Sequence, residues 1–179
     1  NAKKFLKFIG EKSLDFQDKS KKSILALKDK IIWITGASSG IGEALAYACL
    51  EEYATIIISA RREEELKRVA DYPIKGSKSI FILPLDLEHT EDIQKSVDMI
   101  VKRYGRIDVL INNSGMGHRT KAVNTSTAID RKVMEVNFFG TINLTKAVAR
   151  QMQKQKNGKI VVVTSIMGKY GLPLYATYA

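Results

Sequence analysis

The fold is indicated most strongly by Thr35-Gly36-Ala37-Ser38-Ser39-Gly40-Ile41-Gly42. This stretch follows the apolar run 31–34, which is typical of a strand buried on both faces of a sheet. Residues 40–53 then carry alanine and leucine at helical spacing. A glycine-rich turn between a first strand and a first helix is typical of α/β folds that bind a ligand at that turn.

The same alternation continues along the chain. Further apolar runs predict strands over 55–58, 80–83, 107–111 and 159–163, and helical spacing predicts helices over 61–70, 90–104 and 126–153. Thr90 is the expected N-cap of the third helix. Alternating strands and helices predict a doubly wound parallel sheet, the Rossmann fold, with helices on both faces. We expect its first five strands to be present and its C-terminal part to be missing.

Composition excludes several classes of protein. The chain has 179 residues, of which 45% are hydrophobic and 27% charged, and only 3 are prolines, so neither a disordered nor a collagen-like chain is expected. No apolar run reaches the ~18 residues of a membrane-spanning helix. One cysteine and two distant histidines make a disulfide framework and a metal site unexpected.

Positive charge is concentrated at the start of the chain. Residues 1–30 carry nine lysines against four acidic residues, which is half of the net charge of +10. We expect a basic leader over 1–29 that is solvated or associates with a membrane surface. Nucleic acid is not expected as a partner, because no aromatic–basic interleaving and no known reader motif accompany the lysines.

Each glycine of the first turn has a physical purpose. Gly36 permits a sharp turn, Gly40 leaves room for a phosphate beside the backbone, and Gly42 permits close packing of helix on strand. The helix N-terminus then offers free N–H groups and its dipole to a pyrophosphate. We therefore expect residues 30–179 to form a dinucleotide-binding domain that is incomplete at its C-terminal end.

The end of the second strand indicates which dinucleotide binds. An acidic residue at this point would accept hydrogen bonds from a free ribose 2′-hydroxyl and favour NAD. The chain instead has Ser59-Ala60-Arg61-Arg62, and a guanidinium matches a 2′-phosphate in charge and in geometry. NADP, as NADPH, is therefore the expected cofactor and NAD the less favoured one.

A set of motifs in chain order resembles the short-chain dehydrogenase/reductase family. The loop 35–42 is similar to that family's T-G-x-x-x-G-x-G, and Asn112-Asn113-Ser114-Gly115 resembles its N-N-A-G with a serine in place of alanine. Leu85-Asp86-Leu87, Asn137 and the pair Ser165 and Tyr178, thirteen positions apart, also match in order. The residues that flank the motifs resemble those of the member 7 (7 and 7B) branch, whose members are located at the endoplasmic reticulum membrane.

The resemblance implies a set of cofactor contacts. Asp86 would meet the adenine, and Asn112 would tie the fourth strand to its neighbours beside the cofactor. The full set of expected cofactor-binding residues is Thr35, Gly36, Ser38, Ser39, Gly40, Ile41, Gly42, Arg61, Arg62, Asp86, Leu87, Asn113, Ser114 and Gly115.

The resemblance also implies catalytic roles. Tyr178 would exchange a proton with the substrate, Ser165 would hold the substrate oxygen, and Asn137 would anchor a water. Tyr170 and Tyr175 compete for the proton-donor role, but the family's spacing favours Tyr178. The family's lysine would fall three residues beyond the last residue of the sequence, so we expect the chain as written to bind cofactor and to be a poor catalyst.

These observations predict an NADP-dependent oxidoreductase that interconverts a carbonyl and an alcohol. The resemblance to the member 7 branch implies a hydrophobic substrate, such as a steroid, retinoid or lipid. The alternatives are a non-catalytic dinucleotide-binding module or inactive fragment, and a sugar-nucleotide epimerase, which the loop spacing disfavours. A homodimer or homotetramer is expected. Phe138 and Phe139 would pack either at its interface or in the core of one chain. The expected location is the endoplasmic reticulum membrane, or otherwise the cytoplasm.

Overall fold

The structure is a computed structural model that describes residues 26–72 and 79–179. The predicted basic leader lies outside the described residues, apart from 26–29. Within those four residues Leu27 is buried in the core, although the sequence placed it in the leader.

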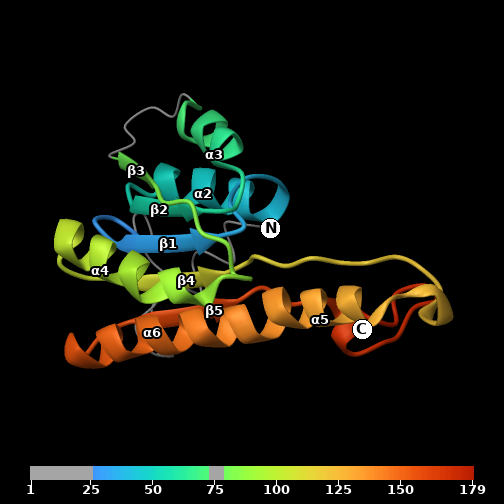
Figure 1. Cartoon of the computed structure of the whole chain (residues 1–179). Helices are drawn as coiled ribbons and strands as arrows, with labels where there is room; N and C mark the ends of the chain where they lie inside the picture. The colour runs from blue at the N-terminus through green and yellow to red at the C-terminus, as the bar shows by residue number, and fades with distance from the viewer. Residues whose placement is uncertain (1–25, 73–78) are drawn as a thin grey trace, which may run out of the picture.

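One parallel sheet organises the described residues (Figure 1). Its strands are β1 (Ile31–Thr35), β2 (Thr55–Ser59), β3 (Ser79–Ile82), β4 (Val109–Asn112) and β5 (Lys159–Val162). The spatial order is β3-β2-β1-β4-β5, and each neighbouring pair is parallel. The chain therefore winds first to one side of β1 and then to the other, which confirms the predicted doubly wound fold.

Helices cover both faces of this sheet (Figure 1). On one face lie α2 (Gly40–Glu51) and α3 (Glu63–Ala70), whose apolar side chains join one buried cluster with those of β1 and β2. On the other face lie α4 (Ile93–Tyr104) and α6 (Thr141–Lys154), which belong to a second buried cluster. The strands are continuous apolar runs because both of their faces are covered in this way.

The centre of the sheet includes an aromatic side chain. Trp33 of β1 has no exposed surface, and its indole Nε1 donates a hydrogen bond of 2.8 Å to the Ser59 hydroxyl of β2. This bond satisfies the one polar atom that burial of the ring would otherwise leave unpaired.

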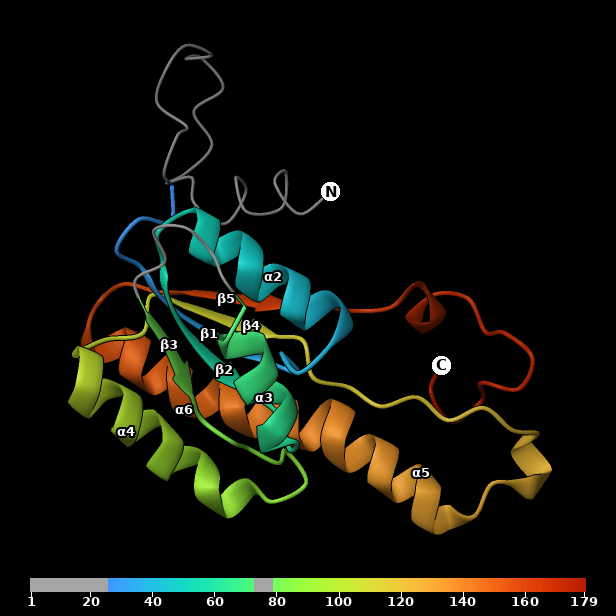
Figure 2. The ribbon, with the colours of Figure 1, turned by 90° about the horizontal axis from the view of Figure 1, so that it is seen from above.

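The predicted long helix over 126–153 is interrupted. It consists of α5 (Thr127–Met134), a π-helical segment η3 (Glu135–Gly140) and α6, and together these form one elongated rod in Figure 2. The Ser126 hydroxyl caps α5 by accepting a bond of 3.4 Å from the Ile129 N–H. The spacing of apolar residues does not reveal the π turn, because the helical pattern of the sequence continues through that turn.

A smaller difference concerns the third predicted helix. Thr90 is not its N-cap but the first residue of the 3₁₀ turn η1 (Thr90–Asp92), which is preceded by His89 and leads into α4. A short 3₁₀ turn at a helix N-terminus is common, and here it leaves Asp92, two residues after Thr90, as the residue before α4.

The last residues of the chain return to α5 (Figure 2). After β5 and the short turn η4 (Ile166–Gly168), the Leu174 carbonyl accepts a bond of 2.9 Å from the Thr120 N–H. The Thr177 hydroxyl donates to Asp130 Oδ1 of α5 at 2.6 Å. Within residues 26–72 and 79–179, no helix combines the length and the apolar character needed to cross a bilayer.

Candidate cofactor site

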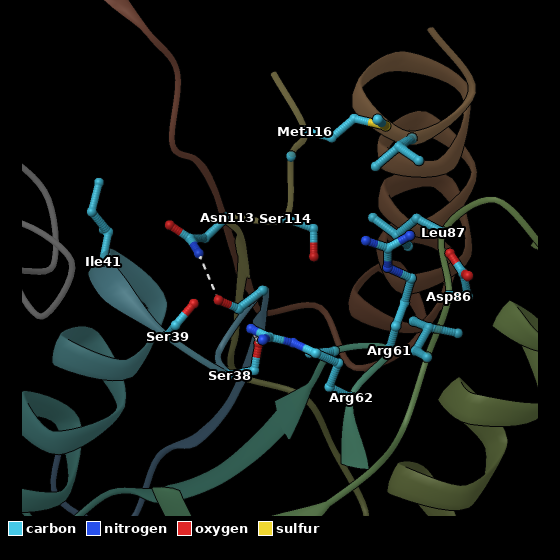
Figure 3. A pocket seen from close by; sticks show the side chains of 15 residues that line it. Ser38, Ser39, Ile41, Arg61, Arg62, Asp86, Leu87, Asn113, Ser114 and Met116 are labelled. Atoms are coloured by element: carbon cyan, nitrogen blue, oxygen red, sulfur yellow. Dashed lines mark hydrogen bonds between the residues drawn. The ribbon is translucent and has the colours of Figure 1, made fainter. Parts of the chain in front are cut away.

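A cavity of about 410 Å³ opens at the carboxyl ends of the strands, where a doubly wound sheet binds its ligand (Figure 3). It lies between the turn after β1, the end of β2, the segment after β3 and the segment after β4. Its lining consists of Gly36, Ser38, Ser39, Ile41, Ala60, Arg61, Arg62, Leu85, Asp86, Leu87, Asn113, Ser114, Gly115, Met116 and Val136.

The glycines of the first turn have the conformations that their predicted roles require. Gly36 and Gly40 have φ of +64° and +61°, a region that L side chains rarely adopt. A Cβ on Gly42 would lie 2.3 Å from the Gly36 carbonyl oxygen, whereas a Cβ on Gly40 would meet nothing within 4 Å. Gly42 therefore permits close packing, and Gly40 leaves open space beside the backbone.

The start of α2 faces this open space. Ser39 precedes the helix but makes no side-chain capping bond to it. The first N–H groups of a helix lack intrahelical partners, and they attract an anion when no side chain caps them. This arrangement fits a phosphate-bearing ligand.

A buried hydroxyl connects the end of β1 to the segment after β4. Thr35 Oγ1 accepts bonds of 3.1 Å from the backbone N–H groups of both Asn113 and Ser114. In return, Asn113 Nδ2 donates to the Thr35 carbonyl at 3.1 Å and to the Gly36 carbonyl at 3.2 Å. Thr35 does not line the cavity itself but holds two residues that do.

The two arginines after β2 point in different directions (Figure 3). Arg62 points toward the glycine turn, and its Nη2 donates to the Ser38 hydroxyl at 3.4 Å. Arg61 points toward Leu87 and Asp86. The Asp86 carboxylate already accepts a bond of 3.0 Å from the Glu88 N–H, which fixes its orientation.

The asparagine of the π segment holds the far side of the cavity. Asn137 Oδ1 accepts from the Met116 N–H at 2.8 Å, and Asn137 Nδ2 donates to the Met116 carbonyl at 2.9 Å. Both polar atoms of this side chain are thus engaged with one backbone unit. π segments occur frequently at functional sites, and this one places Asn137 beside the segment after β4.

Ser165 and Tyr178, the other predicted catalytic residues, do not line the cavity. The Ser165 hydroxyl follows β5 and accepts a bond of 3.2 Å from the Met167 N–H. The Tyr178 ring lies beside Gly117, where an added Cβ would be 3.9 Å from its Cδ2. Tyr170, one of the rival tyrosines, is exposed, and the Arg119 guanidinium lies 6.0 Å from the ring centre of the other, Tyr175.

Asn112 joins β4 to its neighbour through its backbone, since its carbonyl accepts a bond of 2.8 Å from the Val163 N–H, but its side chain has a different partner. Its Nδ2 donates to Thr145 Oγ1 of α6 at 3.0 Å, so its side chain ties β4 to a helix rather than to neighbouring strands. Asn113, one residue later, makes the bonds to the end of β1. Asn112 Oδ1 is buried and has no hydrogen-bond partner within the described part of the chain.

The cavity lining includes most of the residues expected to bind the cofactor, and their binding roles stay predictions. Of the expected cofactor-binding residues, all line the cavity except Thr35, which ends β1, and Gly40 and Gly42, which lie in the first turn of α2. Sequence reasoning did not name Ala60, Leu85, Met116 and Val136 as cofactor contacts, although Ala60 and Leu85 stand in motifs whose other residues were expected to bind. Their only signal is position, because the first three adjoin predicted contacts and Val136 precedes Asn137.

Phe138 and Phe139, for which two environments were predicted, are each 48% exposed. Their rings contact each other edge to face, with centres 5.2 Å apart. Neither ring is buried in the core of this chain.

Comparisons with known proteins agree with this geometry. The family described as short chain dehydrogenase matches residues 30–179. Dehydrogenase/reductase SDR family member 7 of Homo sapiens is 42% identical over 156 residues, which cover 85% of this chain and 46% of that protein. The chain thus spans about half the length of the curated relatives it matches.

Solved structures with different cofactors are similar to this chain. NAD+-bound xylitol dehydrogenase superposes with a TM-score of 0.81 at 29% identity, covering 85% of this chain and 59% of that one. An alcohol dehydrogenase from the archaeon Thermococcus sibiricus, complexed with 5-hydroxy-NADP, gives a TM-score of 0.78 at 27% identity, with coverage of 84% and 64%. The shared fold accommodates either dinucleotide.

Proposed function

This chain belongs to the short-chain dehydrogenase family. We propose that it functions as an NADP-dependent oxidoreductase that interconverts a carbonyl and an alcohol. Its similarity to member 7 proteins confirms the branch that the motifs predicted. Family membership supports a dehydrogenase/reductase that uses a nicotinamide dinucleotide. The choice of NADP, the substrate and the roles of single residues are our proposals.

The observation that carries the NADP preference is the placement of Arg62. It donates to Ser38 at 3.4 Å, on the side of the cavity where the glycine turn meets the end of β2. Neither Ser59 nor Ala60 at the end of β2 offers a carboxylate to a ribose 2′-hydroxyl. A guanidinium and a hydroxyl at this point favour a 2′-phosphate, which needs positive charge and hydrogen-bond donors.

The remaining cofactor contacts follow from the lining. The N-terminus of α2 would hold the pyrophosphate, and Asp86 would contact the adenine. Asn113, Ser114 and Gly115 would lie along the nicotinamide half. When bound, the nicotinamide supplies or accepts the hydride, and the residues of the chain position the reactants.

The residues of the protein have two chemical tasks, which are to stabilise the substrate oxygen and to supply the proton it takes up. Carbonyl reduction develops negative charge on oxygen, which needs a hydrogen-bond donor and then a proton. We assign the donor to the Ser165 hydroxyl and the proton to the Tyr178 phenol. Asn137 would fix the Met116 backbone beside them through its two bonds, and the water expected at Asn137 stays a prediction.

The proposed substrate is hydrophobic. Four exposed large hydrophobic residues lie within nine positions after Ser165, namely Ile166, Tyr170, Leu172 and Leu174. Apolar exposure in the segment that follows the proposed hydrogen-bond donor favours a substrate whose bulk is apolar.

Isothermal titration of the chain with NADPH and with NADH tests the cofactor. We expect tighter binding of NADPH by about tenfold, and Arg62→Ala should remove most of that difference, since one charge-assisted contact is worth ~1.5 kcal/mol or more. Lys102→Ala, which removes an exposed charge from α4, is the control and should change neither affinity. Equal affinities in the unmodified chain would contradict the NADP preference.

NADPH oxidation with a hydrophobic ketone tests the reaction. Turnover that Tyr178→Phe abolishes would support the assigned proton donor. A second candidate function, dinucleotide binding without catalysis, is favoured by one observation: Ser165 and Tyr178 lie outside the cavity lining. Tight NADPH binding without turnover would support that candidate.

A further inference from the structure

Arg68 lies outside the cavity lining but is hydrogen-bonded to the turn that forms one of its walls. It belongs to α3, and its Nη2 donates to the Ser38 carbonyl at 3.1 Å. The same guanidinium forms a two-pronged pair with Glu43 of α2, at 2.8 Å to Oε1 and 3.0 Å to Oε2. Its Nε donates to Glu65 at 2.9 Å. One side chain therefore joins two helices and the glycine turn.

The partner carboxylate is itself fixed. Glu43 stands in the first turn of α2 and also accepts a bond of 2.8 Å from the Tyr47 hydroxyl. The Arg68 bond, followed by the Tyr47 bond, lowers the pKa of Glu43 to about 2. The Tyr47 ring stacks on Tyr72 with centres 4.4 Å apart. Glu43 is therefore ionised at neutral pH and held from two directions.

Ser38 is held from two directions as well. Its carbonyl is bound by Arg68 and its hydroxyl by Arg62, while its own surface is only 7% exposed. Arg62 approaches from the loop after β2, and Arg68 approaches one helical turn and a half later on α3. The orientation of the Ser38 hydroxyl toward Arg62 thus depends on a backbone that Arg68 restrains.

We propose that Arg68 is a positioning residue for the 2′-phosphate of NADP: by fixing Ser38 against α2, it holds the Ser38 hydroxyl and Arg62 in a geometry that receives the phosphate. This inference rests on the proposed NADP-dependent function. A pre-arranged pair of donors loses less freedom on binding than a mobile pair, so affinity for the phosphate rises without any contact from Arg68 itself.

A purely structural role predicts a different result. The Arg68 side chain is 50% exposed, and exposed ion pairs contribute little to global stability. If Arg68 only supported the fold, its loss would weaken all ligands alike. If it positions Ser38, its loss weakens NADPH selectively, because NADH has no phosphate at that point.

The test compares Arg68→Gln with the control Lys67→Gln. Lys67 is the neighbouring residue on α3 and pairs only with Glu63, at 2.9 Å, among the pairs described for it. By titration calorimetry on the full chain, we expect Arg68→Gln to weaken NADPH about tenfold and NADH less than about twofold. Arg68→Lys should not restore affinity, since an ammonium cannot reproduce the forked geometry. Lys67→Gln should leave both affinities unchanged.

A second measurement needs no cofactor. Hydrogen–deuterium exchange of the segment 36–42 should be faster in Arg68→Gln than in Lys67→Gln, with melting temperatures that stay close. Unchanged exchange and an unchanged NADPH affinity would overturn the proposal, and so would an equal loss of NADPH and NADH affinity.

The affinities of the unmodified chain distinguish a wrong cofactor preference from a wrong role of Arg68. If the unmodified chain binds NADH as tightly as NADPH, the proposed cofactor preference fails, and with it the role of Arg68 toward the 2′-phosphate. If the unmodified chain prefers NADPH and Arg68→Gln keeps the full preference, only the role of Arg68 fails.

Discussion

At the end of β1, one hydroxyl determines how two neighbouring segments meet. Thr35 Oγ1 accepts from the N–H groups of Asn113 and Ser114, and Thr35 is only 1% exposed. Backbone N–H groups that lose their acceptor and cannot reach water cost free energy. Thr35 therefore positions Asn113 and Ser114, which line the cavity, although Thr35 itself does not.

Thr35→Val should lower the free energy of unfolding by about 2 kcal/mol or more, because it leaves those two N–H groups without their acceptor. Thr35→Ser keeps the hydroxyl and should cost only about 1 kcal/mol for the lost methyl group. Urea unfolding followed by circular dichroism measures both values. Equal losses in the two variants would show that the hydroxyl has no such role.

Glu43 predicts a specific dependence on pH. Its pKa is lowered from an ordinary 4.5 to about 2 in the folded chain, so the unfolded chain takes up the proton first as the pH falls. The stability that the Glu43 carboxylate contributes is therefore complete above about pH 4.5 and is lost as the pH falls toward 2. The advantage of the unmodified chain over Glu43→Gln in urea unfolding should shrink between pH 6 and pH 3. A difference that stays constant over this range would contradict the lowered pKa.

Among the elements, the rod formed by α5, η3 and α6 has the greatest influence on the site. Its π segment carries Asn137, and it ends at Gly140, which lies against the segment after β3. A Cβ on Gly140 would stand 2.3 Å from the Leu87 carbonyl oxygen, and Leu87 lines the cavity. The contact of helix with cavity wall therefore depends on the absence of a side chain.

Gly140→Ala should destabilise the chain by about 1–3 kcal/mol, since the added methyl group must displace backbone. It should also weaken dinucleotide binding through Leu87. Gly168→Ala is the matched control, because nothing lies within 4 Å of a Cβ there. Thermal unfolding of both variants measures the difference, and a melting temperature of Gly140→Ala equal to that of Gly168→Ala would refute the steric argument.

The elements show what sequence can and cannot predict. The strands were found to within two residues at each end, since an apolar run buried on both faces is a local signal. The glycine turn was found for the same reason, because its three glycines and the helix start are contiguous. The π segment was not predicted, since 126–153 keeps an uninterrupted helical pattern.

Contacts between distant residues were also beyond sequence reasoning. Glu43 and Arg68 are 25 positions apart, and Thr35 and Ser114 are 79 apart. The local sequence around each residue gives no signal of its distant partner, so only the folded chain shows that the two meet. The same reasoning explains Asn112, whose partner Thr145 lies 33 positions away on a helix.

Two kinds of contact hold the whole molecule together, apolar packing and polar bonds. The sheet and its helices are held by two large apolar clusters, one on each face. The segment 166–179 contributes no residue to either cluster and makes polar contacts with the rest of the chain, such as the bond of Thr177 to Asp130. We therefore expect this segment to detach before the sheet unfolds.

Asp130→Ala should release the segment 166–179 while leaving the free energy of global unfolding changed by about 1 kcal/mol or less. Limited proteolysis should then cut near Lys169 faster than in the unmodified chain. Asp130→Asn keeps an acceptor for the Thr177 hydroxyl and should resemble the unmodified chain. Equal cutting rates in all three proteins would mean that the contact does not restrain the segment.

The burial of Trp33 has an optical consequence. It is the only tryptophan of the chain, and it has no exposed surface, belongs to the apolar cluster that α4 and α6 cover, and is bonded to Ser59. Its fluorescence should therefore be that of an indole shielded from water and should shift to longer wavelength only when the centre of the sheet opens. Detachment of the segment 166–179 should leave this emission unchanged. Trp33 fluorescence therefore distinguishes detachment of that segment from unfolding of the core without any added label.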